Sequence, residues 1–196
     1  MRHFFALLLI LILGLTSCEG RKSQNQALAE SIDNFKKNTS VEKLTYTPKN
    51  YTYQNIDTTF VNGFSIYNKL YIDMENSILV EEKNKNSIVH KTYIREGKAD
   101  VIVKFKDEIL FSETIDNTFI LQTDATQKDT LKNMTLLNVF VDKTFSNQSQ
   151  TNKTDIFIQF YNPKNTKAQL SYKLTINLNK KYTLQKIKNT NQSYTF

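Results

Sequence analysis

Hydrophobic and polar residues alternate along most of the chain from about Val41 onward, and this alternation predicts β-strands. Over residues 64–74 the apolar positions recur every second residue, with polar or tyrosine residues between them. The clearest alternation covers residues 170–178. Groups of Asn, Lys, Asp and Pro separate these segments and are typical of turns. The pattern therefore predicts one antiparallel all-β domain over residues 41–196.

Shorter segments of the same kind complete the predicted sheet. Further strands are expected at residues 101–105, 109–115, 156–160 and 182–187, with turns at 106–108, 162–165 and 179–181. Residues 124–133 are polar and predict a loop or a single helical turn, whereas residues 134–145 are again apolar. Only four glycines are present, which disfavours a closed barrel with glycine corners. We expect an antiparallel β-sandwich or an open, curved half-barrel.

A different period precedes the β domain. Leu28, Ile32 and Phe35 recur at the spacing of one face of a helix, and acidic and basic residues lie elsewhere on the turn. Residues 18–40 are therefore expected to form a polar tether with a short amphipathic helix. We expect this helix to dock weakly on the β domain, the alternative being that it only extends the tether.

The first residues form another apolar pattern. Arg2 precedes a nearly unbroken apolar run over residues 4–13, which is shorter than the ~20 apolar residues that a membrane-spanning helix needs. The run fits the apolar region of a secretory signal peptide over residues 1–17. The ending Leu15-Thr16-Ser17-Cys18 resembles the lipobox of bacterial lipoproteins, in which the cysteine becomes the first mature residue. This resemblance implies that Cys18 carries palmitate-type acyl chains.

The charge of the chain is positive but dispersed. There are 26 Lys and Arg residues against 19 Asp and Glu, a net charge of +7, and loss of Arg2 with the signal peptide leaves +6. The lysines are scattered among asparagines and threonines without the basic stripe or motif of a nucleic-acid-binding protein. We interpret them as a solvated surface, the alternative being a weak affinity for anionic lipids or acidic glycans, and we expect no nucleic-acid partner.

Motifs for catalysis, metals and cofactors are scarce. After processing, His90 is the only histidine and Cys18 the only cysteine, so the usual ligands of a zinc site are missing. His90 lies in an expected strand, where a structural or solvent-facing role is the simpler interpretation. The sequence contains no Gly-x-Ser-x-Gly motif, calcium loop or glycine-rich phosphate loop. We therefore expect a non-enzymatic protein without a metal or cofactor.

Neighbouring carboxylates leave one enzymatic alternative open, since paired acids can support glycoside hydrolysis. The candidate pairs are Asp73 with Glu75, Glu81 with Glu82, and Asp107 with Glu108. Asp73 and Glu75 would share one strand face, but Lys69 and Tyr71 share it too, which favours an exposed charged face. The other two pairs fall at expected turns, where acidic residues are common.

Tyrosines are the remaining candidates for a functional surface. Exposed tyrosines can stack on sugar rings or anchor a protein interface, although they also pack against strand edges. The chain has no tryptophan, the preferred platform for sugars, so a glycan partner gains little support. The possible aromatic contact surface comprises Tyr46, Tyr51, Tyr53, Tyr67 and Tyr71.

The layout of lipobox, polar tether and antiparallel β domain resembles the small outer-membrane lipoproteins of Bacteroidota that belong to domain-of-unknown-function families. This resemblance implies a lipid-anchored protein of the outer membrane. In that phylum, an acidic run directly after the cysteine resembles the signal for export to the cell surface. Residues 19–22, Glu-Gly-Arg-Lys, do not form such a run. We therefore expect the domain to face the periplasm.

Two short segments resemble the Asp-Ser/Thr-apolar sequence at which Bacteroidota attach O-linked glycans. They are Asp57-Thr58-Thr59 and Asp129-Thr130-Leu131, which makes Thr58 and Thr130 possible O-glycosylation sites. Both lie where the pattern predicts loops or strand edges.

Taken with the scarcity of catalytic motifs, these features predict a membrane-anchored binding or scaffold module with an envelope protein or glycan partner. The first alternative is a lipid or lipoprotein carrier that holds acyl chains in an apolar cavity of ~300–1,000 Å³. The second is a hydrolase that depends on a carboxylate pair.

Overall fold

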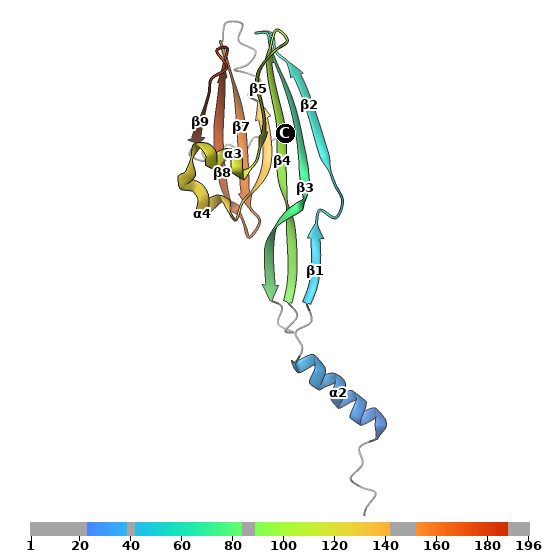
Figure 1. Ribbon diagram of the computed structural model, residues 1–196. Coiled ribbons are helices and arrows are strands. Elements are labelled where there is room, and N and C mark those ends of the chain that lie inside the picture. The colour runs from blue at the N-terminus through green and yellow to red at the C-terminus, as the bar shows by residue number, and fades with distance from the viewer. Residues whose placement is uncertain (1–22, 39–41, 84–88, 142–151, 188–196) are drawn as a thin grey trace, which may run out of the picture. The chain divides into compact units, whose positions relative to one another are not determined.

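The computed structural model describes residues 23–38, 42–83, 89–141 and 152–187 (Figure 1). The chain divides into two compact units, Met1–Glu42 with Lys83–Val89 and Lys43–Glu82 with His90–Phe196. Helix α2 (Gln24–Asn38) belongs to the first unit, and the second contains nearly all of the β-strands. The expected signal peptide and Cys18 lie outside the described residues.

The predicted amphipathic helix is confirmed as α2. It begins with a reciprocal cap: Gln26 N donates to Ser23 Oγ at 3.2 Å, and Ser23 N donates to Gln26 Oε1 at 3.1 Å. Leu28, Ile32 and Phe35 are 61%, 44% and 64% exposed. Docking of this helix on the β domain stays a prediction.

The β domain is built from two sheets (Figure 1), which confirms the expected all-β fold. The first sheet has the order β1-β4-β3-β2, and β5 pairs with β4 as its fifth strand. Its strands are β1 (Glu42–Thr47), β2 (Tyr53–Thr59), β3 (Phe64–Lys83), β4 (Val89–Phe105) and β5 (Glu108–Ile115). The second sheet has the order β6-β7-β8-β9, with all three pairings antiparallel. Its strands are β6 (Thr135–Val141), β7 (Lys153–Asn162), β8 (Asn165–Asn177) and β9 (Tyr182–Ile187).

Three short helical elements connect the two sheets. They are α3 (Asn117–Thr123), η1 (Ala125–Gln127) and α4 (Lys128–Leu131). The polar segment 124–133 therefore folds into two consecutive short helical elements, where a loop or a single helical turn is expected. Asp116 caps α3 by accepting a hydrogen bond from Phe119 N at 3.0 Å.

Two strands of the first sheet are much longer than the five or six residues of an average strand. β3 has 20 residues and β4 has 17. The alternation over 64–74 predicts only the first part of β3, because the polar residues after Met74 resemble a strand end. Asp73 instead accepts hydrogen bonds from Glu75 N at 2.9 Å and Asn76 Nδ2 at 2.8 Å, and the strand continues past them.

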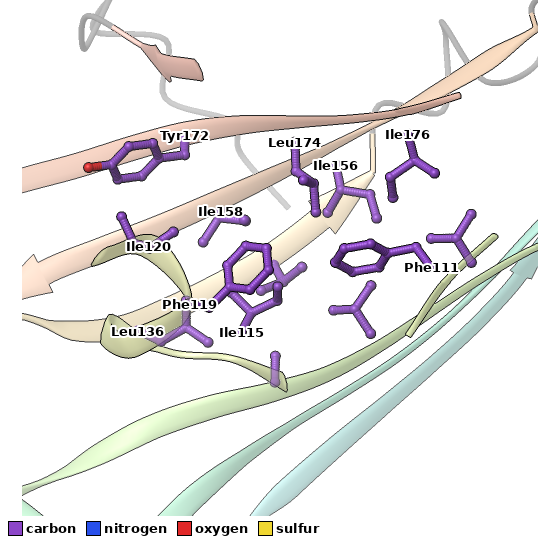
Figure 2. Packing of buried hydrophobic residues seen from close by; sticks show 14 of the residues in the cluster. Phe111, Ile115, Phe119, Ile120, Leu136, Ile156, Ile158, Tyr172, Leu174 and Ile176 are labelled. Atoms are coloured by element: carbon purple, nitrogen blue, oxygen red, sulfur yellow. The ribbon is translucent and has the colours of Figure 1, made fainter. Parts of the chain in front are cut away.

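A contiguous apolar core joins the two sheets (Figure 2). The expected inward face of β8 is confirmed, since Leu174 and Ile176 are fully buried. Phe64 and Ile66 of β3 are also in the core, whereas Met74, farther along the same face, is 36% exposed. The members of the cluster that Figure 2 labels are Phe111, Ile115, Phe119, Ile120, Leu136, Ile156, Ile158, Tyr172, Leu174 and Ile176.

Polar contacts hold β6 of the second sheet against the long strands of the first sheet. The buried Asn68 of β3 donates from Nδ2 to the carbonyl oxygen of Val139 at 2.8 Å. Gly97 N of β4 donates to Thr135 Oγ1 at 2.7 Å. These bonds satisfy the Asn68 amide nitrogen and the Gly97 N–H, which the sheet junction removes from water.

The tight turn between β4 and β5 confirms the turn predicted at 106–108. Lys106 and Asp107 have positive φ values of 48° and 72°, and Phe105 pairs with Glu108 across them. This conformation matches the two-residue loops whose twist suits a hairpin.

Candidate functional site

Three tyrosine rings and one lysine gather on the first sheet and form what we call the tyrosine–lysine surface: Tyr51, Tyr53, Lys69 and Tyr71. The Tyr51 ring lies 6.0 Å from that of Tyr53 and 6.4 Å from that of Tyr71, centroid to centroid. The Lys69 ammonium lies 5.7 Å from the Tyr53 ring centroid and 5.6 Å from that of Tyr71, within the range of cation–π attraction. These contacts pre-arrange the four side chains.

The pairing of β2 with β3 creates this surface. Tyr53 is the direct partner of Tyr71, and Asn55 is the partner of Lys69, so these side chains share one face of the sheet. Phe64 and Ile66 alternate with them on β3 and point into the core, which places the tyrosine–lysine surface on the outward face.

Two rings of this surface are exposed to solvent, whereas Tyr71 and Lys69 are half-buried. Tyr53 is 62% exposed and Tyr51 is 47% exposed, and Asn55 beside them is exposed as well. Large aromatic side chains of this kind contribute most strongly to binding when a partner covers them.

The surface is tied to β4 and β5 through Asp100. The Tyr71 hydroxyl donates to Asp100 Oδ1 at 3.4 Å, and Thr114 Oγ1 donates to the same oxygen at 2.8 Å. Burial, reinforced by the Asp100 carboxylate, raises the pKa of Tyr71. Tyr71 is therefore held as a neutral phenol in a fixed orientation.

Charged side chains continue along the same face beyond Tyr71. Lys98 Nζ of β4 lies 2.9 Å from Asp73 Oδ2 and 3.9 Å from Asp116 Oδ2. Burial alone would raise the pKa of Asp73, but hydrogen bonds from Asn76, the Glu75 backbone and Lys98 outweigh it and hold that pKa well below its usual value. The hydrogen bond to Asp73 raises the pKa of Lys98.

Glu96 lies close enough to this network for the Asp73 charge to affect its pKa. The pKa of Glu96 shifts in the opposite direction to that of Asp73. Burial, with the nearby Asp73 carboxylate, raises the pKa of Glu96. Two neighbouring carboxyl groups whose pKa values are shifted in opposite directions are typical of catalytic acid–base pairs. Asp73, however, already accepts hydrogen bonds from three donors, so the arrangement also serves as a structural clamp between β3 and β4.

Tyr46 belongs to a separate aromatic group on β1. Its ring stacks on Tyr93 of β4 at 4.9 Å with an interplanar angle of 18°, and the Arg95 guanidinium lies 5.0 Å from its centroid. Arg95 also donates from Nη1 to the carbonyl oxygen of Met74. The structure therefore separates Tyr46 from Tyr51, Tyr53 and Tyr71.

The fifth predicted tyrosine, Tyr67, shares the outward face of β3 without joining the ring cluster. Its partner in the register is Asp57 of β2. The sequence pattern indicates Lys69 only as part of an exposed face, and it does not predict a role for Asp100. The signal for Lys69 was its position two residues from both Tyr67 and Tyr71, which places all three on one strand face.

The two expected glycosylation threonines lie in different settings. Thr58 is half-buried on the edge strand β2, where it pairs with Ile66. Thr130 is exposed on the single helical turn α4. Modification of either stays a prediction, and Thr130 is the more accessible of the two.

The other carboxylate pairs lie apart from the tyrosine–lysine surface. Glu81 and Glu82 are exposed near the end of β3. Asp107 and Glu108 lie at the β4–β5 hairpin, where Glu108 Oε1 is 2.8 Å from Lys180 Nζ. His90 is half-buried near the start of β4.

Two further properties of the described residues bear on the site. Within residues 23–38, 42–83, 89–141 and 152–187, no group of three or more His, Cys, Asp and Glu side chains is placed to hold a metal ion. In the same part of the chain, no helix has both the length and the apolar character to cross a membrane.

Comparison with known proteins adds no family to this description. No protein-family model matches the chain, and a search of curated proteins found no match.

Proposed function

We propose that this chain is a lipid-anchored, non-catalytic protein of the outer membrane, whose β domain faces the periplasm and binds an envelope partner through the tyrosine–lysine surface. The anchor is supported by the lipobox-like ending at Cys18. The binding role rests on one observation: the Tyr51 ring contacts the rings of both Tyr53 and Tyr71, and Tyr51 and Tyr53 are exposed to solvent.

The chemistry of this surface suits a protein or glycan partner. Tyrosine supplies a wide apolar face at a small cost in conformational entropy, because its side chain has few rotatable bonds. Lys69 adds a positive charge between the rings, and Asn55 adds an exposed amide beside it. A partner that covers the surface would thus find apolar contact and hydrogen-bonding groups together.

The carrier alternative receives less support from the packing between the sheets. A carrier needs an apolar space for acyl chains, whereas the inward side chains of both sheets here form one contiguous cluster. Tyr172, Phe64 and Phe160 are the largest fully buried members of that cluster. Acyl chains would have to displace side chains that already pack against one another.

A photo-cross-linking experiment in native envelopes tests the binding role. A photoreactive phenylalanine derivative replaces Asn55, which is exposed beside Lys69, and in a second variant it replaces Gln185, which is exposed on β9. We expect a defined adduct from position 55 and none of that mass from position 185. Equal adducts from both positions, or none from position 55, would contradict the proposal.

The tyrosines can then be tested within the same experiment. Tyr53→Ala should abolish the adduct from position 55, because Tyr53 is the most exposed ring of the cluster. Tyr46→Ala is the matched control, since Tyr46 is also exposed but stacks on Tyr93 in the other aromatic group. If Tyr46→Ala removes the adduct and Tyr53→Ala does not, the partner binds β1 and not the tyrosine–lysine surface.

Intact-mass measurement tests the anchor independently of the partner. The mature chain from the membrane fraction should begin at Cys18 and carry the mass of acyl chains, and Cys18→Ser should remove both that mass and the membrane association. A mature chain that starts elsewhere, or Cys18 without acyl chains, would refute the anchor.

A further inference from the structure

The apolar stripe of α2 offers a second surface that the proposed partner site does not use. Leu28, Ile32 and Phe35 lie within about 60° of one another around the helix axis, given about 100° per residue. They are 61%, 44% and 64% exposed, so all three present a large part of their apolar surface to solvent. Glu30 and Asp33 occupy the opposite side of the helix.

The distance along the chain from Cys18 to this stripe is short. Six peptide units connect Cys18 with Gln24, where α2 begins, and they reach at most ~22 Å when fully extended. A lipid on Cys18 thus keeps the start of α2 within that distance of the bilayer. The helix has 15 residues and a length of ~22 Å, so it can lie flat on the surface with all three apolar side chains at one depth.

We propose that α2 lies along the surface of the membrane that holds the Cys18 lipid, with Leu28, Ile32 and Phe35 inserted among the lipid headgroups and upper acyl chains. This inference rests on the proposed lipid anchor. Three apolar side chains alone would bind a bilayer weakly, but the tether keeps them at high local concentration. The sequence places Arg21, Lys22, Lys36 and Lys37 at the two ends of the helix, where basic residues suit anionic headgroups.

The composition of the chain provides a direct test. It contains no tryptophan and one cysteine, so a single tryptophan reports one position and the Cys18 thiol accepts one maleimide lipid. The chain from Cys18 onward is coupled in this way to phosphatidylethanolamine–phosphatidylglycerol vesicles. Phe35→Trp places the reporter in the stripe, and Asp33→Trp is the matched control on the opposite side of the helix.

We expect the Phe35→Trp emission to shift to shorter wavelength on coupling to vesicles and to be quenched by brominated lipids, and the Asp33→Trp emission to do neither. Equal quenching at both positions, or none at position 35, would overturn the proposal. A short-wavelength Phe35→Trp emission already present without vesicles would also overturn it, in favour of docking on the β domain or on a second copy. Because the anchor is supplied chemically, these outcomes do not depend on whether Cys18 is lipidated in the cell.

Discussion

Gly97 of β4 lies directly against the backbone of Leu136 of β6. A Cβ atom built on Gly97 would approach the carbonyl oxygen of Leu136 to 2.4 Å, far inside van der Waals contact. The neighbouring bond from Gly97 N to Thr135 Oγ1 fixes the same two strands at this separation. The absence of a side chain at position 97 is therefore what allows the second sheet to approach the first so closely.

Gly97→Ala should destabilise the β domain because the new methyl group meets backbone that cannot rotate away. We expect the free energy of unfolding to fall by about 1–3 kcal/mol, the usual cost of overpacking. Urea denaturation of the variant and of the wild-type protein measures this change in the free energy of unfolding. Ser112→Ala is the control, since Ser112 is exposed on β5, and it should change the stability by less than ~0.5 kcal/mol. Equal stability of the two variants would mean that the sheets separate more easily than the Gly97–Leu136 contact indicates.

Leu174→Ala tests the inward face of β8. Leu174 is fully buried between the sheets, so truncation should cost about 2–5 kcal/mol in the free energy of unfolding. Leu137→Ala provides a matched control with the same chemical change, because Leu137 is 42% exposed on β6. Thermal or urea unfolding of both variants gives the difference directly. A near-neutral Leu174→Ala beside a costly Leu137→Ala would show that the strand faces are inverted.

Several strands of this domain could be predicted because they carry their own alternation, whereas β1 and β2 carry too little of it to be predicted as separate strands. The spacing of Leu174 and Ile176 is enough to predict that they are buried, and the residue types around Asp107 are enough to predict a turn. The continuation of β3 past Asp73 could not be predicted in this way. It depends on hydrogen bonds from Glu75 and Asn76 that satisfy a polar group in the middle of a strand.

The candidate site could be predicted only in part, for a related reason. Periodicity shows which face of β3 carries Tyr71, but not which strand lies beside it. Asp100 comes 29 residues later in the chain and reaches Tyr71 only because β4 pairs with β3. The division of the tyrosines also depends on pairing, since Tyr46 follows β1 to its place against Tyr93. Sheet order, and not local pattern, decides these neighbours.

Asp73 and Glu96 should affect stability with opposite sign. The folded-state pKa of Asp73 is depressed, so its carboxylate stabilises the fold above its unfolded pKa of about 4, and this contribution is lost as the pH falls. The folded-state pKa of Glu96 is raised, so ionisation of Glu96 weakens the fold as the pH rises through that value. At neutral pH, Asp73→Asn should therefore lower the free energy of unfolding, whereas Glu96→Gln should raise it.

Unfolding curves between acid and neutral pH test this pair of predictions. The Glu96→Gln difference should vanish in acid, where Glu96 is protonated in both states, and the Asp73→Asn difference should shrink progressively as the pH falls below the unfolded pKa of Asp73. Glu113→Gln is the control, because Glu113 is an exposed acid on β5. A stabilising Asp73→Asn at neutral pH would mean that the Asp73–Lys98 ion pair costs more in lost hydration than it returns.

Tyr172 combines complete burial with a hydroxyl group that has no hydrogen-bond partner among the described residues. Burial, with the Asp124 carboxylate nearby, raises the pKa of Tyr172 to about 12. A buried hydroxyl group without a partner costs about 1–3 kcal/mol in desolvation. Tyr172→Phe removes this oxygen and keeps the ring, so we expect the free energy of unfolding at neutral pH to stay equal or to rise by about 1 kcal/mol.

Tyr71→Phe is the matched control for Tyr172→Phe, because it removes a hydroxyl group that does have a partner. Loss of the bond to Asp100 should lower the free energy of unfolding by about 0.5–1.5 kcal/mol. Absorbance titration of the phenols gives a second measurement: Tyr172→Phe should remove a tyrosine that ionises near pH 12. If Tyr172→Phe destabilises the domain as much as Tyr71→Phe does, a buried water molecule bonds to the Tyr172 hydroxyl, and the core contains a polar site that the sheets enclose.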